Sequence, residues 1–246
     1  MNTEAASRKS HYFSSIDGLR FFASLNIVLF HLEFMGGFNE LNGSPGWFFR
    51  IIKGPTLHAT FFFFLGGFIF TTKFFPALEH FNLKQFLFKR FRELYPLHLI
   101  TTLLMTILFV IRESSAGTLD ILKMGFSMIL HLSFLWPFFP FNSYSLNRPS
   151  WALAAFFFCY VLFGVMIQFL KKIDTRRKIL LYCGILFLPS LLWDWLFALS
   201  GTQDSLYQFF HAFPPLRVIE FFIGMLSARF FMLTPKNRYH NKLISN

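Results

Sequence analysis

The sequence is poor in the residues that build disulfide frameworks, zinc sites and soluble surfaces. Its two cysteines, Cys159 and Cys183, both lie inside apolar segments, so neither a disulfide framework nor a zinc site is expected. Charged residues make up only 14% of the 246 positions, while 54% are hydrophobic. No serine–histidine–aspartate arrangement and no metal-ligand spacing stands out, so no metal is expected. This composition argues against a soluble protein.

Negative charge is also scarce. The chain has 12 acidic residues against 23 basic ones, which gives a formal net charge of +11. In a soluble protein this excess would raise the question of nucleic acid. Here the basic residues cluster between apolar segments, where they orient helices and attract anionic headgroups or a phosphorylated donor. We therefore expect the lipid bilayer as a partner and no nucleic acid.

Apolar runs are abundant, and 40 residues are phenylalanine. The runs recur at lengths near the ~20 residues needed to cross ~30 Å of hydrocarbon. They predict an all-α polytopic membrane bundle of about seven spans, forming one domain over residues 1–246. The predicted spans are approximately 16–34, 57–75, 95–111, 119–139, 149–170, 179–199 and 214–231. Between and around them we expect a cytoplasmic tail (1–15), an amphipathic cytoplasmic element (76–93) and a basic tail (232–246).

The positions of the basic loops conflict with strict alternation of seven spans. A cytoplasmic N-terminus places the basic 76–93 element in the cytoplasm, as its charges require. Alternation then places the 171–178 loop and the C-terminal tail outside, although both are basic. Either the fourth segment, which contains Pro137 and Pro140, dips in and returns, or the 171–178 loop is an exception.

The first apolar segment, IDGLRFFASLNIVLFHL, carries the most informative chemistry, because it holds Asp17, Arg20 and His31. On a helix, Arg20 and His31 are close to three turns and about 16 Å apart, on nearly the same face. Ionisable groups at depth in a bilayer are usually functional. Alternatively, Arg20 snorkels to the interface and His31 forms a hydrogen bond with a neighbouring helix.

Other motifs each admit a structural and a functional interpretation. In KRFRELYP, Arg90 and Arg92 either anchor the helix or bind donor phosphates, and Tyr95 follows them. Gly66 and Gly67 indicate close helix packing. Arg217 and Glu220 share a helical face and can neutralise each other. His131 is expected to be a satisfied helix-contact histidine. Trp151 lies in the string PSWAL.

Taken in order, these strings resemble the type-3 membrane acyltransferases. The matching elements are IDGLR-x10-H, FFxxxGF, KRFRxxYP, PSWxL and RxxEFxxG. The chain departs from the family pattern where Gly66 replaces a serine, Glu93 an arginine and Phe156 an acid, and where Ala152 and Ala154 replace two serines. The family usually has about ten spans, so the resemblance also implies that the last few are missing here.

The resemblance implies O-acylation, often O-acetylation, of surface polysaccharide. An acyl group would move from a cytoplasmic acyl-CoA, a co-substrate and not a permanently bound cofactor, to a carbohydrate hydroxyl. His31 would be the catalytic base, with Arg20 and Asp17 as catalytic partners. The donor would bind Arg90, Arg92 and Tyr95. The residues expected to line the site are Gly66, Gly67, Trp151, Arg217 and Glu220.

The expected location is the bacterial inner membrane, with the N-terminus in the cytoplasm. Two alternatives to the enzyme remain open. One is a truncated or degenerate relative that acts as an assembly partner, which the residues Glu93 and Phe156 favour. The other is a small transporter or flippase, which would be expected to show broken helices in symmetric halves.

Overall fold

The computed structural model describes residues 14–34, 55–139, 146–200 and 210–234, and these residues are helical with no strand. The α-helices are α1 (Ser14–Phe34), α3 (Pro55–Phe74), α4 (Leu83–Ala116), α5 (Ile121–Leu132), α6 (Trp151–Leu170), α7 (Arg176–Ser200) and α9 (Pro214–Met232). Short 3-10 helices are η1 (Phe75–His80), η2 (Trp136–Phe138) and η3 (Arg148–Ser150). The expectation of an all-α membrane protein is confirmed. Three helical segments, Ala59–His80, Leu83–Ala116 and Arg148–Leu170, are long and apolar enough to cross a membrane.

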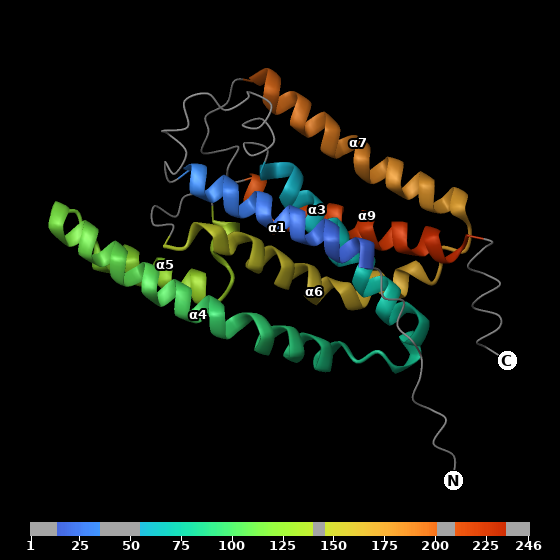
Figure 1. Ribbon diagram of the computed structural model, residues 1–246, viewed down its shortest axis with the longest axis horizontal. Coiled ribbons are helices and arrows are strands. Elements are labelled where there is room, and N and C mark those ends of the chain that lie inside the picture. Colours follow the sequence, from blue (N-terminus) through green and yellow to red (C-terminus); the bar gives the residue numbers. More distant parts are fainter. Residues whose placement is uncertain (1–13, 35–54, 140–145, 201–209, 235–246) are drawn as a thin grey trace, which may run out of the picture.

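Helices α3, α6 and α9 form the centre of the bundle (Figure 1). The backbones of α3 and α9 approach so closely that a Cβ atom on Gly67 would overlap the carbonyl oxygen of Phe221. On the other helix, a Cβ on Gly224 would overlap the carbonyl oxygen of Phe64. Small residues permit this approach between membrane helices. Gly67 is therefore a packing residue of the α3–α9 contact.

Aromatic rings fill the space between this centre and the first half of α4. Phe163 of α6 is fully buried, and its ring lies 5.4 Å from Phe86 of α4 and 6.1 Å from Phe70 of α3. Most ring pairs around Phe70, Phe74 and Phe86 meet edge to face, the geometry that aromatic quadrupoles favour. The high phenylalanine content thus supplies the core as well as the surface that faces lipid.

Helix α4 differs from the sequence-based expectation. We predicted an amphipathic element over 76–93 and a separate span over 95–111. Instead, Pro76 lies in η1, Asn82 caps a new helix by accepting a hydrogen bond from the Gln85 amide (3.1 Å), and that helix continues to Ala116. At ~1.5 Å per residue its 34 residues extend about 51 Å, well beyond the ~30 Å hydrocarbon layer. Most of the predicted amphipathic element, from Leu83 onward, is therefore continuous with the predicted span 95–111 in one helix.

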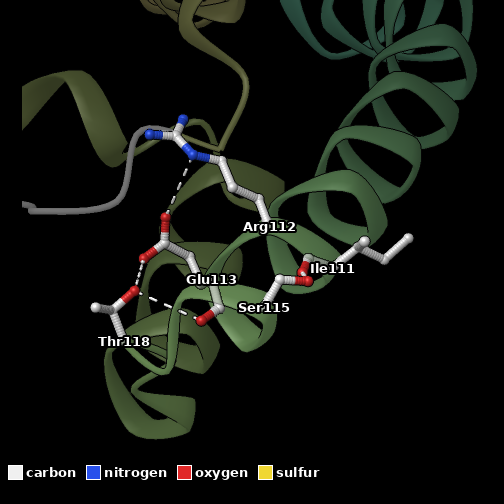
Figure 2. Close-up of polar contacts among 5 residues, drawn as sticks. All are labelled: Ile111, Arg112, Glu113, Ser115 and Thr118. Carbon is white, nitrogen blue, oxygen red and sulfur yellow. Dashed lines mark hydrogen bonds and ion pairs between the residues drawn. The ribbon is translucent and has the colours of Figure 1, made fainter.

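The far end of α4 is closed by its own side chains, as Figure 2 shows. Gly117 adopts a left-handed conformation (φ 68°), and the Thr118 amide donates to the Glu113 carbonyl (3.0 Å). The Glu113 carboxylate accepts a hydrogen bond from the Thr118 hydroxyl (2.6 Å) and pairs loosely with Arg112 (3.8 Å). Such an end satisfies carbonyls that the helix leaves open. Most of residues 112–118, which separate the predicted spans 95–111 and 119–139, are consequently helical.

Helix α5 is the second difference. We expected a span over 119–139, but the α-helix contains only 12 residues. It starts at the cap Asp120, whose side chain accepts from the Lys123 amide (3.0 Å), and it ends before Phe134, which has a positive φ of 60°. About 18 Å of helix is too short to cross ~30 Å of hydrocarbon.

A buried polar network ties this short helix to α4. The His98 ring donates from Nε2 to the His131 carbonyl (2.9 Å), and the His131 ring donates from Nδ1 to the Ser127 carbonyl (2.8 Å). The Asn147 amide N–H faces His131 Nε2 (3.4 Å), and its side-chain amide donates to Thr102 (3.3 Å). His131 is thus the satisfied helix-contact histidine that the sequence predicted.

We expect Asn147→Leu to lower stability by about 1–3 kcal/mol, because it removes the two side-chain hydrogen bonds that the Asn147 amide donates to Thr101 and Thr102 of α4. The measurement is thermal unfolding in detergent. Asn82→Leu is the matched control, since Asn82 is exposed and holds only a helix cap, worth about 1 kcal/mol. Equal losses in the two variants would contradict a network role for Asn147.

The basic segments that lie far apart in sequence meet at one end of the bundle (Figure 1). Arg229, near the end of α9, donates from Nε to the Ile173 carbonyl in the α6–α7 loop (3.1 Å). Its guanidinium also lies 4.6 Å from the centre of the Phe75 ring in η1. The α3–α4 connection, the α6–α7 loop and the end of α9 are therefore neighbours. We call this end of the bundle the basic end.

Candidate functional site

Helix α1 lies against α3 and runs in the opposite direction (Figure 1). Ala23 is buried in this contact, whereas Phe21 and Phe22 are both 63% exposed. Arg20 consequently lies toward the basic end of the bundle, and His31 lies about three turns away, toward the opposite end. Asp17 lies within α1, but its side chain is outside the described residues.

His31 is partly buried and its ring has a defined orientation. Nδ1 lies 2.8 Å from the carbonyl oxygen of Ile27, and the ring meets Phe30 edge to face at 5.3 Å. A carbonyl can only accept, so the hydrogen is on Nδ1. In the neutral imidazole this leaves the lone pair on Nε2, the form that a general base requires.

Arg90 of α4 turns inward at the basic end. Its guanidinium lies 5.4 Å from the centre of the Phe70 ring and pairs with Glu93 at 2.8 Å. Arg20, Arg90 and Glu93 are all within electrostatic range of the Tyr160 hydroxyl on α6. Arg20 and Arg90, which are 70 positions apart in sequence, thus both act on the electrostatic environment of one side chain.

The other two predicted donor residues point elsewhere. Arg92 is exposed, with its guanidinium 5.6 Å from the Phe88 ring. Two positions along a helix turn a side chain by about 200°, so Arg90 and Arg92 lie on opposite faces. Tyr95 stacks on Phe91 at 4.3 Å and meets Phe134 edge to face. Of the three, Arg90 is the one that shares with Arg20 an electrostatic influence on Tyr160.

At the opposite end of the centre, α3 and α9 share a second ionic group. Arg217, which is 8% exposed, donates to Glu220 at 2.5 Å, and the Thr60 hydroxyl donates to the same carboxylate oxygen at 2.8 Å. The predicted self-neutralised pair is present, and Thr60 joins it from α3. Because Arg217 and Glu220 both lie on α9, the link between the two helices is made by the Thr60 hydroxyl.

Trp151 and His211 lie beside this ionic group. The two rings meet at 4.8 Å, and the Trp151 ring is 6.2 Å from that of Phe63. Burial lowers the pKa of His211 to about 4, and the positive charge of Arg217 acts in the same direction. The His211 imidazole is therefore neutral at physiological pH.

Two departures from the family pattern face each other. A Cβ atom on Gly66 would lie 3.1 Å from Cε1 of Phe156, and Phe156 stacks on Phe63 at 4.2 Å. The Phe156 ring, which stands where the family pattern has an acid, therefore packs directly against Gly66. A larger residue at position 66 would collide with this ring. Gly66 of α3 and Phe156 of α6 are therefore in contact, and both replace polar residues of the family pattern with apolar ones.

Sequence reasoning did not select Thr60, Tyr160 or His211 for the site. Thr60 and His211 belong to no motif; the packing of α3 against α9 brings Thr60 to Arg217, and His211 meets Trp151 of α6. Tyr160 stands at a position that matches the family string. Among the described residues, no group of histidine, cysteine or acidic side chains could hold a metal ion.

Comparison with known proteins gives a consistent result. A family model described as an acyltransferase domain matches residues 13–245. Acyltransferase MdmB from Streptomyces mycarofaciens is 27% identical over 222 residues, which cover 87% of this chain and 56% of that protein. The chain thus spans just over half the length of this relative. No solved structure matches. On the family match over nearly its whole length, the chain belongs to the type-3 acyltransferase family.

Proposed function

We propose that the protein transfers an acyl group, typically acetyl, from acyl-CoA to a hydroxyl of a carbohydrate acceptor. The observation that carries this proposal is the arrangement on α1. Arg20 and Arg90 both lie toward the basic end and both act electrostatically on Tyr160, while His31 presents Nε2 about 16 Å further along α1 from Arg20. A pantetheine arm is of about this length, so phosphates held near Arg20 would place the thioester near His31.

The residues then have distinct roles. Arg90 and Arg20 hold donor phosphates through charge-assisted hydrogen bonds. His31 accepts the proton of the acceptor hydroxyl through Nε2 as the oxygen attacks the thioester carbonyl, and coenzyme A leaves as its thiolate. Imidazole suits this step because its ordinary pKa lies near neutrality. Asp17 orients or neutralises Arg20.

The proposed topology places the basic end in the cytoplasm of a bacterial inner membrane. Both the N-terminal end of α1 and the end of α9 lie at this end (Figure 1). In this arrangement α1, α3, α4, α6, α7 and α9 cross the bilayer, and α5 enters without crossing. Residues 171–178 then lie in the cytoplasm, as the positive-inside rule requires. This is the first of the two explanations offered for the conflict in the sequence.

A test of the function is release of free coenzyme A. The purified protein in phospholipid nanodiscs would be given acetyl-CoA and a panel of oligosaccharides, with a thiol reagent as readout and mass spectrometry of the glycans as confirmation. We expect acceptor-dependent thiol release and a mass increase of one acetyl group. Acetyl-CoA binding with no release for any acceptor would contradict the proposal.

That negative outcome would instead favour a non-catalytic relative that acts as an assembly partner. Two observations support this second candidate. Glu93 already neutralises Arg90 at 2.8 Å, and the Phe156 ring stands in an aromatic stack where the family has an acid. The two candidates differ in turnover and not in folding, so the same preparation serves both.

The Arg90–Glu93 pair yields a paired prediction on donor binding. Arg90→Ala should weaken coenzyme A binding about 10- to 100-fold, because it removes charge-assisted hydrogen bonds to phosphate. Glu93→Gln should tighten binding, since it leaves Arg90 charged and removes the competing carboxylate. Isothermal titration of the protein in detergent measures both effects.

The control for this pair is Arg112→Ala. Arg112 also neighbours a glutamate on α4 (Figure 2), but it lies in the last turns of this helix, whereas Arg90 lies near its start. Its replacement should leave coenzyme A affinity unchanged. A loss of affinity in Arg112→Ala equal to that in Arg90→Ala would refute the placement of the donor at the basic end.

A further inference from the structure

The basic end carries a second cationic surface, separate from Arg90. We define it as the basic platform, made of Lys171, Lys172, Arg176, Arg177, Lys178 and Arg229. It belongs to the α6–α7 loop, the first turn of α7 and the last turns of α9. Asp174 is the acid within this loop, and its carboxylate is bonded to Lys178 at 2.7 Å. The platform therefore retains a strong excess of positive charge.

Two arginines of the platform are fixed in position by aromatic rings. The Arg176 guanidinium lies 5.0 Å from the centre of the Phe230 ring, and that of Arg229 lies 4.6 Å from the Phe75 ring. Nε of Arg229 is used by the Ile173 carbonyl. Nε of Arg176 is buried and has no hydrogen-bond partner among the described residues. Guanidinium groups held in this way are suited to bind phosphate oxygens.

An exposed apolar face of α7 begins at Arg177, the exposed arginine of the platform that is next in sequence to Arg176. Leu181, Ile185 and Leu188 are 62%, 54% and 61% exposed. They follow Arg177 at helical spacing, so all four side chains lie on one face. The distance from Arg177 to Leu188 is about 16 Å, close to half of the ~30 Å hydrocarbon layer. The face thus has the depth of one bilayer leaflet.

We infer that the basic platform and this face of α7 bind an anionic phospholipid. Arg176, Arg229 and the exposed cations contact the headgroup phosphate, and an acyl chain lies along Leu181, Ile185 and Leu188. Charge complementarity selects an anionic headgroup. The continuous apolar face selects a lipid over a soluble phosphate. The inference does not depend on acyl transfer, because it concerns a surface on the α7–α9 side of the bundle.

The test is lipid competition on the purified full chain in detergent. Phosphatidylglycerol and phosphatidylcholine with the same acyl chains are added in equal amounts, and native mass spectrometry measures the bound lipids. We expect retention of phosphatidylglycerol over phosphatidylcholine. Each basic residue near a membrane surface is worth about a fivefold change in affinity. R176Q/R229Q should therefore lower the preference by more than tenfold.

Two further variants keep the result interpretable if R176Q/R229Q fails to fold. K171Q/K172Q removes charge from two exposed side chains and should also reduce the preference. R112Q removes an exposed arginine at the opposite end and should not change it. Equal binding of the two lipids, or an unchanged preference in K171Q/K172Q, overturns the inference. Complete displacement of the lipid by millimolar glycerol 3-phosphate or coenzyme A also overturns it, because the platform would then be a soluble-phosphate site.

Discussion

His31→Ala is expected to reduce acyl transfer by about 10²- to 10⁴-fold while the protein remains folded. The reduction is the usual contribution of a positioned general base. Folding should be little affected, because the side chain is only partly buried and its hydrogen bond from Nδ1 runs to the Ile27 carbonyl within its own helix. The measurement is the thiol-release assay together with thermal unfolding. Only kcat should fall strongly, since His31 does not hold the donor phosphates.

Two controls separate chemistry from packing in this experiment. His80→Ala removes an exposed histidine in η1 and should retain full activity. His31→Gln keeps a hydrogen-bonding side chain but supplies no base at neutral pH, so it should be as inactive as His31→Ala. Full activity in His31→Gln would show that the ring acts only by hydrogen bonding and would remove the catalytic assignment.

The sequence predicted the helices well because hydrophobic length is a local property. The positions of α1, α3, α6, α7 and α9 follow from apolar runs bounded by polar or basic residues. The boundaries of α4 and α5 were harder to predict from the sequence. Whether the 76–93 element and the next apolar run form one helix depends on the cap at Asn82 and on the absence of a break at Pro96, which the run itself does not encode.

The site was predictable only where its residues lie on one helix. The spacing of Arg20 and His31, and that of Arg217 and Glu220, can be read directly from helical geometry. That Arg90 and Arg20 both act on Tyr160, or that Thr60 meets Arg217, depends on which faces of different helices meet. The same reason explains why Arg92 was grouped with Arg90: positive charge in an amphipathic stretch does not reveal which side chain turns inward.

Substitution of the two glycines at the α3–α9 contact is expected to have the largest effect on stability. Gly67→Ala and Gly224→Ala each place a methyl group where the facing helix has a backbone carbonyl. A backbone atom cannot move aside as a side-chain end can, so the helices must separate. Overpacking of this kind costs about 3 kcal/mol or more. We expect both variants to lose most of their yield and to unfold at clearly lower temperature in detergent.

Other helical glycines of the chain serve as controls for this test, because the same Gly→Ala change meets less crowding there. Gly125 and Gly184 have no atom within 4 Å of an added Cβ, so Gly125→Ala and Gly184→Ala should be neutral or more stable by up to about 1 kcal/mol. Gly66→Ala should fall between the two groups, because its methyl would meet the movable Phe156 ring at 3.1 Å. The separation of α3 and α9 would also pull Thr60 from Arg217 and Glu220. A Gly67→Ala protein as stable as Gly184→Ala would therefore contradict the packing of the bundle centre as well as the ionic group it supports.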